Sequence, residues 1–519
     1  MDFDLIVRGG WVIDGSGGPA FRADVGVTDT MVSAVARLDG SNAAKVLDAT
    51  GLYVVPGFID AHVHGDTMIL DDPVHLPALR QGVTTYIIGQ DGCSFAPGSP
   101  ATIDYMRRYT AGFNGNPDTI DYTWRNLDEY LARFDRRTAV NVAYLIPNGN
   151  VRIEVMGHDP RPATDDELKA MARMVREGMD TGAVGLSTGL DYIPSRYADA
   201  REIAALCEAI VPDDGVYVTH MRAYGPNAKV GMDEVFDIVE RSGVAAHISH
   251  FNGPAKLLLP LLERGLKAGH DLTYDTYPYT AWSTILGMVT LPPWVQEGTT
   301  DATLARLADP AIRKRLADKE LGHLSPFLLH ETTLAMVAAP DWRWAEGMTI
   351  AKAADRAGLI VADFICDILL ASDFAVGVVG RSGDRDENDV RAILRHPAHM
   401  AGSDGIFRGG APHPRGWGSF ARFLGHHTRE LGDYTWPEAV THLSSHAARR
   451  FRLADRGLIR PGFAADLALF DPKTVADRAT YQDGRALAVG VHHVVVNGTI
   501  ALENGEPTGK TPGRALRRG

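Results

Sequence analysis

Short apolar runs alternate with amphipathic segments through the middle of this chain, a pattern typical of strands and helices around a parallel sheet. Thr164-Asp165-Asp166-Glu167 is a capping box, and it predicts a helix to about Asp180 with one apolar face. Further helices are predicted over about 198–210, 233–241, 256–268 and 387–394. Eight apolar runs have the length of buried strands: Tyr53 to Ile59, Val83 to Ile88, Val140 to Ile146, Ala183 to Leu186, Val216 to Thr219, Ala245 to Ser249, Asp271 to Thr276, and Met400 to Ser403. Eight parallel strands joined by helices predict a closed (β/α)8 barrel, a TIM-like α/β fold.

The two ends of the chain have a different pattern. Residues 1–54 and 455–519 contain short strand-like pieces separated by turns, over 5–7, 11–13, 25–27, 32–35, 466–471 and 494–496. Neither end alone supplies enough strands for a stable sheet. We therefore expect the two ends to pair into one small discontinuous β-domain beside a barrel that covers 55–454.

A long connection separates the seventh and eighth predicted strands. It runs from Tyr277 to His399, is rich in proline and tryptophan near Leu291, and has helical patterns later. Connections of this length in a compact domain usually carry function. We interpret 285–397 as an insertion in the barrel that acts as a lid over the substrate.

Composition narrows the range of partners. Apolar residues make up 45% of the 519 residues, enough for a large core, and the net charge is -13. Nucleic acid and anionic membranes both reward clustered lysine and arginine, so neither is an expected partner. The short basic tail, Arg514 with Arg517 and Arg518, is expected to be a solvated end.

Three widely spaced cysteines, Cys93, Cys207 and Cys366, do not make a disulfide framework, which favours a reducing compartment. The first residues lack a leader pattern, and no stretch approaches the roughly 18 apolar residues of a membrane span. We therefore expect a cytoplasmic protein. The oligomeric state stays open, a homo-oligomer included.

The segment Asp60-Ala61-His62-Val63-His64 follows the first apolar run and places two imidazoles two residues apart. In a strand such residues share a face, so His62 and His64 can bind one metal ion, although an isolated pair can equally be ordinary core or surface histidines. Four more candidate ligands follow other predicted strands: Asp91, His220, His250 and Asp404. Since the carboxyl ends of barrel strands meet at one mouth, we expect these side chains to converge.

This donor set suits zinc or a similar divalent ion, and so many ligands leave room for one ion or two. A bound ion would generate an attacking hydroxide and polarise a carbonyl. Asp404 is then the candidate general base and acid, against the simpler interpretation of a turn-forming aspartate in Ser-Asp-Gly. Six histidines that fall in predicted helices and loops are interpreted as ordinary surface or core residues: His75, His158, His323, His330, His426 and His427.

At these motifs the chain resembles the amidohydrolase superfamily, and more closely the N-acyl-D-amino-acid deacylase (D-aminoacylase) family. The resemblance covers nearly the whole chain and rests on segments 56–64, 192–198, 219–222, 249–250, 277–280, 402–405, 413–415 and 462–467. It implies zinc-dependent removal of an N-acyl group from a D-amino acid. It also implies His220 and His250 as firm ligands, His62 and His64 at a neighbouring metal position, and Asp404 as the catalytic residue.

Two departures from the family pattern limit this inference. Where the family has a metal-binding cysteine after the second strand, the flanking residues align Asp91 with that position, while Cys93 is the alternative two residues on. Other amidohydrolases carry a carboxylated lysine at the end of the fourth strand, and this chain has no lysine there. The second departure is at residue 252. Where similar enzymes place a lysine for the substrate carboxylate, this chain has Asn252, which cannot supply a charge.

Recognition of the substrate would then fall to Arg415, Tyr192, Tyr277 and Ser283 around Asn252, or the substrate lacks a carboxylate. Tyr192 and Tyr277 can equally be packed aromatics, and Arg415 a surface charge. We favour a buried Arg415 that clamps a carboxylate. His247 is on the same predicted strand as His250 and would share its face. It lies deeper in the barrel, however, where core packing is expected.

The sequence therefore predicts a metal-dependent hydrolase that cleaves a linear amide of a small molecule. Two alternatives keep the barrel: hydrolysis of a cyclic amide, and a non-catalytic scaffold. A third is a serine hydrolase, because Gly185-Leu186-Ser187-Thr188-Gly189 fits the nucleophile-elbow pattern. That elbow requires a helix directly after the serine, and Pro194 argues for a loop.

Overall fold

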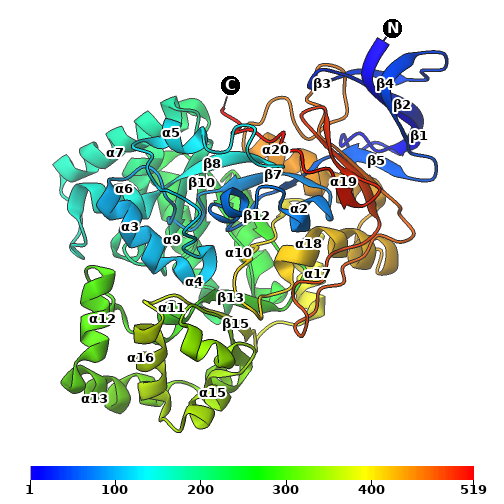
Figure 1. Ribbon diagram of the computed structural model, residues 1–519. Coiled ribbons are helices and arrows are strands. Elements are labelled where there is room, and N and C mark those ends of the chain that lie inside the picture. Colours follow the sequence, from blue (N-terminus) through cyan, green and yellow to red (C-terminus); the bar gives the residue numbers. More distant parts are fainter. Residues whose placement is uncertain (1, 519) are drawn as a thin grey trace.

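Eight parallel strands form the central barrel of the protein, which the computed structural model describes over residues 2–518 (Figure 1). Each strand pairs with its neighbours in chain order: β6 (Phe58–Asp60), β7 (Val83–Ile88), β8 (Asn141–Pro147), β9 (Gly185–Gly189), β10 (Val216–His220), β11 (Ala245–Ile248), β12 (Leu272–Thr276) and β16 (His399–Ala401). Backbone hydrogen bonds from Ala61 N to Ala401 O, at 3.0 Å, and from Asp404 N to His62 O, at 2.7 Å, join the first strand to the last. The predicted barrel is confirmed.

Helices surround the barrel as the periodicity predicted. The capping box at Thr164 is formed, and Glu167 Oε2 accepts a hydrogen bond from Thr164 N at 2.8 Å at the start of α7 (Asp165–Asp180). The other predicted helices are α8 (Ala200–Glu208), α9 (Ala228–Ser242), α10 (Ala255–Lys267) and α17 (Glu387–Leu394). The remaining helices outside the long connection are α1 (Met68–Asp71), α2 (Leu76–Leu79), α3 (Pro100–Tyr109), α4 (Ala111–Asn114), α5 (Leu127–Leu131), α6 (Asn148–Met156), α18 (Arg415–Arg422), α19 (Trp436–Val440) and α20 (His446–Arg450).

The first predicted strand, Tyr53 to Ile59, is wrong as a single element. It divides at Gly57 into β5 (Tyr53–Pro56), which belongs to the sheet of the chain ends, and β6 of the barrel. A side chain at Gly57 would place its Cβ 2.2 Å from Thr84 Oγ1, so the chain passes here only without one. Both halves are apolar because both are buried, and hydropathy alone could not separate them.

Both ends of the chain do pair into one sheet, as expected, and it lies beside the barrel at the upper right of Figure 1. β5 pairs with β1 on one side and with β17 on the other. The predicted pieces 5–7 and 11–13 form one strand with an irregular register between Val7 and Gly10, and β4 was not predicted. The strands are β1 (Asp2–Val12), β2 (Phe21–Thr28), β3 (Met31–Ala36), β4 (Asn42–Asp48), β17 (Leu467–Phe470), β18 (Val491–Val496), β19 (Thr499–Glu503) and β20 (Glu506–Pro507).

The basic tail is not a solvated end, contrary to expectation. Its backbone pairs with barrel strand β8 through a parallel bridge between Ala515 and Val142. Arg517 Nη1 donates to Thr181 O at 2.8 Å, and Arg518 donates to the carboxylate and carbonyl of Asp213, each at 2.6 Å. Arg518 thus pairs with a carboxylate, while Arg517 keeps 36% of its side chain exposed as it contacts Thr181 O and Asp128 Oδ1.

The long connection forms a lobe below the barrel in Figure 1. Its three-stranded sheet has the order β13-β15-β14 and starts at residue 281, before the predicted insertion. Helix α17, at the other end, packs on α10 and β16 of the barrel. The lobe contains β13 (Ala281–Ile285), α11 (Leu286–Thr290), α12 (Thr300–Ala308), α13 (Pro310–Lys319), α14 (Pro326–Glu331), β14 (Thr332–Val337), α15 (Ile350–Ala357), α16 (Val361–Ala371) and β15 (Val376–Arg381). The domain limits 1–54 with 455–519, 55–454 and 285–397 stay a prediction.

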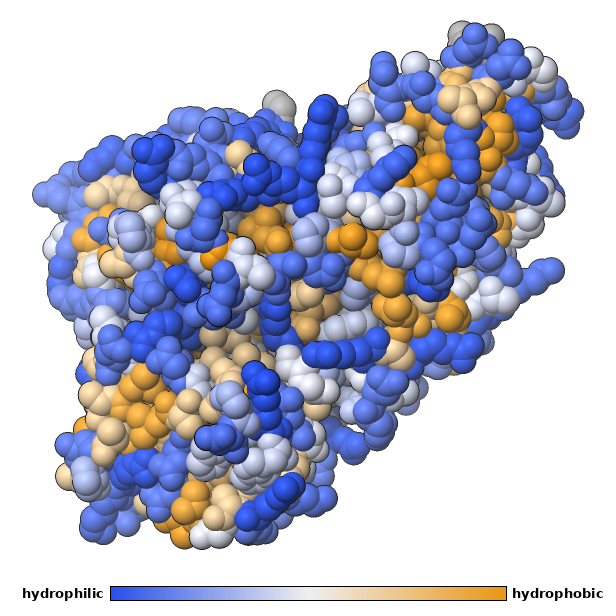
Figure 2. Space-filling view, in the orientation of Figure 1, coloured by the Kyte–Doolittle hydropathy of each residue, from blue (hydrophilic) through white to orange (hydrophobic). Residues whose placement is uncertain are grey.

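The surface is largely hydrophilic in the face that Figure 2 shows, with apolar residues gathered on the sheet of the chain ends and on the lobe. On that sheet Trp11, Phe21 and Val46 are exposed. Within residues 2–518, no helix combines the length and the apolar character needed to cross a bilayer.

Candidate metal centre and substrate cavity

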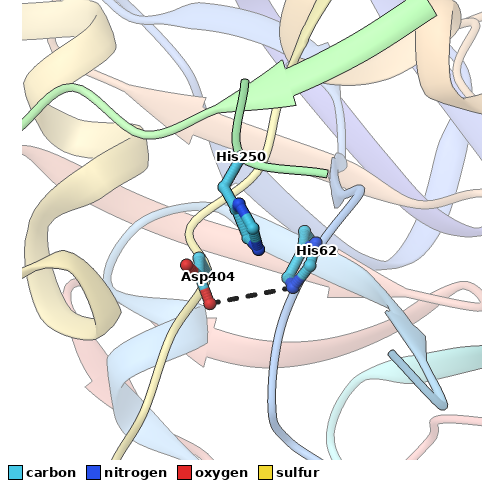
Figure 3. Close-up of side chains that lie close together, drawn as sticks. All are labelled: His62, His250 and Asp404. Carbon is cyan, nitrogen blue, oxygen red and sulfur yellow. Dashed lines mark ion pairs between the residues drawn. The ribbon is translucent and has the colours of Figure 1, made fainter. Parts of the chain in front are cut away.

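The six predicted ligands lie together at the carboxyl end of the barrel. His62 and His64 follow β6, Asp91 follows β7, His220 ends β10, His250 follows β11 and Asp404 follows β16. Figure 3 shows His62, His250 and Asp404, which come from three separate segments, with their side chains turned toward one another. Residues far apart in the sequence thus meet because the strands that carry them are neighbours in one closed sheet.

These side chains form three overlapping groups whose ligand atoms lie within 4.8 Å of one another: His62 with His64 and Asp91, Asp91 with His220 and His250, and His62 with His250 and Asp404. Asp91 belongs to two of them. Its Oδ1 lies 3.7 Å from His62 Nε2, and its Oδ2 lies 3.7 Å from His220 Nδ1. His64 Nε2 lies 3.6 Å from Oδ2 and His250 Nε2 lies 4.0 Å from Oδ1, so each oxygen faces one histidine of each group. The carboxylate is therefore shared between the two groups, as a bridging ligand would be.

Three of the ligand residues have backbone angles that are uncommon for residues other than glycine. The φ angles are 56° at Asp91, 34° at His250 and 49° at Asp404. Each lies just after a strand, where a left-handed residue turns the chain. Such conformations have a free-energy cost and persist where the surrounding structure holds them, often at functional sites. The turn before Asp91 also needs Gly89, since a Cβ there would lie 2.3 Å from Leu145 O.

The buried charges of the cluster shift one another's protonation. Burial alone would lower the pKa of His62, but the carboxylates of Asp275 and Asp91 outweigh it and raise this pKa to about 9. Burial lowers the pKa of His250 to about 4, and the neighbouring His220 adds to that effect. Burial opposes ionisation of Asp404, yet the guanidinium of Arg415 holds the pKa of Asp404 well below its usual range. The cluster therefore keeps its carboxylates ionised.

Sequence reasoning missed Asp275, which lies beneath the cluster on β12. Its Oδ2 is 3.5 Å from His62 Nδ1 and 3.0 Å from His247 Nε2, and its Oδ1 accepts a hydrogen bond from His250 N at 3.0 Å. His247 is fully buried in the core, as expected. Asp404 was predicted because it directly follows a predicted strand. Asp275 is also close to the carboxyl end of its strand, but it stands inside the predicted apolar run, so the same criterion did not single it out.

The structure brings Asp91 into the cluster, whereas Cys93 joins none of the metal-ligand groups found in residues 2–518. Cys93 is buried and free, as are Cys207 and Cys366. Burial, with the charge of Asp91 nearby, raises the pKa of the Cys93 thiol well above its usual range. A thiol held protonated is a poor metal ligand, because the thiolate is the form that binds.

A cavity of about 600 Å³ opens directly over the cluster. Of the candidate ligands, His64, Asp91, His220, His250 and Asp404 line it. The predicted substrate-binding residues all line it as well: Tyr192, Asn252, Tyr277, Ser283 and Arg415. The far wall comes from the lobe, through residues of β13, α11 and α14. The lobe therefore covers the candidate metal centre.

Arg415 is fully buried and is not a surface charge. Its Nη1 lies 2.8 Å from Asp404 Oδ2, its Nη2 donates to Ser283 O at 3.2 Å, and its guanidinium lies over the ring of Tyr277. The Tyr192 hydroxyl hydrogen-bonds Thr284 Oγ1 at 2.7 Å, and the Ser283 hydroxyl donates to Val378 O at 2.8 Å. Both hydroxyls are thus tied to the lobe's sheet.

Arg385 supplies a positive charge beside Asn252, and sequence reasoning did not find it. Its Nη1 donates to Asn252 Oδ1, its Nη2 to Tyr279 O at 2.5 Å and its Nε to Thr280 O at 3.3 Å. A guanidinium has five N–H groups, so two remain for a ligand. Arg385 lies in the return segment between β15 and α17, which has no periodicity that could have placed it.

The serine-hydrolase alternative is wrong. Ser187 lies inside strand β9, and its buried hydroxyl donates to Gly89 O at 2.5 Å. The chain then continues to Gly189 as strand, so the helix that an exposed nucleophile elbow requires does not follow.

Comparison with known proteins agrees with this geometry. A family model described as "Amidohydrolase family" matches residues 45–502. A D-aminoacylase of Alcaligenes xylosoxydans xylosoxydans is 34% identical over 528 residues, covering 99% of this chain and 98% of the relative. A crystal structure of D-aminoacylase has a TM-score of 0.82 at 32% identity and covers 99% of this chain and 100% of that chain.

N-acyl-D-glutamate deacylase from Bordetella bronchiseptica has the same TM-score of 0.82, at 30% identity over 100% of both chains. That structure holds zinc and a phosphonate inhibitor that mimics the tetrahedral intermediate of the reaction. The resemblance inferred from the sequence motifs is thereby confirmed. The chain belongs to the amidohydrolase family and, within it, to the D-aminoacylase family.

Proposed function

We propose that this protein is a metal-dependent amidohydrolase that hydrolyses the linear amide bond of N-acyl-D-amino acids. The observation that carries the proposal is the position of Asp91 in two metal-ligand groups at once, beside Asp404 and beneath the cavity. The acyl-D-amino acid as substrate class is taken from the relatives named above.

The donor set fits one or two zinc ions. Nε2 of His62 and Oδ1 of Asp91 are buried without a hydrogen-bond partner among the described residues, and a bound ion would coordinate both atoms. Imidazole and carboxylate are ordinary zinc ligands, and bound zinc lowers the pKa of water to roughly 7 and polarises a carbonyl. The residues that would hold the ions are His62, His64, Asp91, His220, His250 and Asp404.

Asp404 has the position of a proton carrier. Its Oδ1 lies 3.3 Å from His64 Nε2, and its Oδ2 is held by Arg415, so the carboxylate has a fixed orientation at the cavity floor. In the proposed reaction Asp404 takes a proton from the attacking water as the carbon–oxygen bond forms. It then gives that proton to the nitrogen as the carbon–nitrogen bond breaks.

The cavity can hold the two ends of such a substrate differently. Arg385 and Arg415, with Tyr277 between them, offer charge and donors for a carboxylate. The opposite wall is apolar and includes Trp282, Met288, Val289, Phe327 and Leu328 of the lobe. We propose that Tyr192, Asn252 and Ser283 contact the substrate between these walls.

A substrate screen tests the proposal. Purified protein loaded with zinc is mixed with N-acetyl derivatives of D- and L-methionine and of D- and L-glutamate, and with a 5-substituted hydantoin as a cyclic amide. Release of a free D-amino acid that a chelator abolishes is the expected result. Ring opening without release from linear substrates would favour the cyclic-amide alternative, and no turnover with zinc bound would favour the non-catalytic scaffold.

A further inference from the structure

A second cluster of metal-ligating side chains lies outside the cavity, where α17 meets the π-helix Phe423–Glu430. It consists of Glu387, the first residue of α17, and of His426 and His427. Nε2 of His426 lies 3.3 Å from Glu387 Oε1, and Nε2 of His427 lies 3.9 Å from the same oxygen. Ligands about 2.0–2.1 Å from a tetrahedral zinc are about 3.4 Å apart, so these spacings are those of an ion site.

The imidazoles of His426 and His427 are both oriented so that Nε2 faces Glu387. His427 Nδ1 is paired with Asp433 Oδ2 at 3.0 Å, and His426 Nδ1 with Glu430 Oε2 at 3.1 Å. A carboxylate that accepts the Nδ1 proton leaves the lone pair on Nε2, which in both rings faces Glu387. Carboxylates in this role orient the histidine ligands of many metal sites.

His427 also carries an unsatisfied atom. Its side chain is fully buried, and within residues 2–518 its Nε2 has no hydrogen-bond partner. A buried polar atom left unpaired costs about 1–3 kcal/mol, and a cation between Nε2 and Glu387 would remove that cost.

Charged groups of both signs surround the cluster. Three carboxylates face it, from Glu387, Glu430 and Asp433. Each of the three is also paired with an arginine. Arg422 Nη2 donates to Glu387 Oε1 at 3.3 Å, Arg391 Nε donates to both oxygens of Asp433 at 3.0 Å, and Arg429 Nη2 lies 2.9 Å from Glu430 Oε1. The lone pairs of both Nε2 atoms are left for the ion.

We propose that Glu387, His426 and His427 bind one divalent transition-metal ion, with zinc the best match to two imidazoles and a carboxylate. The site is separate from the candidate metal centre of the cavity. The ion would join the start of α17 to the π-helix, two residues after Arg385 of the cavity wall. The sequence alone gave no reason to connect these residues, because Glu387 precedes the histidines by about forty positions.

Equilibrium dialysis of the full-length protein against zinc, with the bound metal counted by mass spectrometry, tests this site. Glu387→Gln keeps the shape of the side chain and removes its charge, and His426→Gln removes one nitrogen ligand. The matched control is His396→Gln, because His396 pairs with a single carboxylate, Glu263, at 3.0 Å. We expect the wild type and the control to bind one more zinc per chain than either site variant.

Equal zinc in all four proteins at saturating zinc would overturn the proposal, and so would an equal loss in the control. If Glu387→Gln misfolds by circular dichroism, the result with His426→Gln decides, since His426 is partly exposed. A second readout is the thermal midpoint. Added zinc should raise it less in the site variants than in the control, and an equal rise would also contradict the site.

Discussion

Nδ1 of His62 lies 3.5 Å from Oδ2 of Asp275, a carboxylate fully buried beneath the candidate metal centre. The same side chain accepts a hydrogen bond from the backbone N–H of His250. Asp275 thus positions two candidate ligands from below without reaching the cavity, which it does not line. Its role is to fix the direction of the His62 ring.

Replacing Asp275 by Asn should weaken zinc binding by about 10–100-fold, the usual loss when a carboxylate behind a metal-binding histidine is removed. Competition with a chromophoric chelator measures the affinity. Thr273→Val is the matched control, since Thr273 bonds the other nitrogen of His247 and not Asp275. Unchanged affinity in Asp275→Asn would show that His62 is oriented without it.

Replacing Asp404 by Asn should lower kcat by about 10²–10⁴-fold, the usual contribution of a general base and acid. Zinc content should stay near that of the wild type, because the other proposed ligands remain. Asp384→Asn is the control, as Asp384 also lines the cavity but belongs to none of the ligand groups within the described residues. Substantial turnover by the zinc-loaded Asp404 variant would contradict the proton-carrier role.

Asp91 and Cys93 can be separated by substitution. We expect Asp91→Ala to lose bound zinc and activity together, because Asp91 belongs to two ligand groups. Cys93→Ala should keep both, since its buried thiol lies outside those groups. Metal analysis on the two purified variants checks this, and the opposite pattern would assign the ligand to Cys93.

Arg385 should carry the charge that Asn252 lacks. Losing a charge-assisted hydrogen bond of about 1.5–3 kcal/mol predicts that Arg385→Gln lowers kcat/KM for N-acyl-D-amino acids by roughly 10–100-fold, mainly through KM. Adding Asn252→Lys to that variant should restore part of the loss, because the new ammonium lies beside the vacated position. Arg381→Gln is the control, an arginine of the same wall whose side chain is 71% exposed.

An unchanged KM in Arg385→Gln would mean that the substrate carboxylate lies elsewhere or is absent. Failure of Asn252→Lys to rescue, with an intact fold, would mean that Arg385 acts through the segment it anchors to Tyr279 and Thr280 rather than through its charge.

The sequence could place the barrel strands and the ligands that follow them because both depend on local pattern. Burial makes a strand apolar, and a polar residue directly after it stands out, as Asp404 does. Asp275 was missed because it interrupts an apolar run from within, and the division at Gly57 was missed because both sides are buried.

Contacts between distant segments left no such signal. Arg385 hydrogen-bonds Asn252, which lies about 130 residues earlier in the chain. The sequence around neither residue indicates this contact. The basic tail is a second example. An arginine in a sequence gives no indication of whether its side chain faces water or a carboxylate such as that of Asp213. Local composition predicts burial by class of residue, whereas pairing depends on the completed fold.

The pairing of β5 with β17 has a consequence for the folding of this protein during synthesis. Pro56 pairs with Leu467, roughly 410 residues later. At the ribosome's pace of about 5–20 residues per second, the early strands wait roughly 20–80 s for that partner. During this time β5 presents an unpaired edge, which is open to incorrect pairing with other chains. Translation speed and chaperone supply should therefore govern the yield of this protein more than they would for a chain whose neighbouring strands are made consecutively.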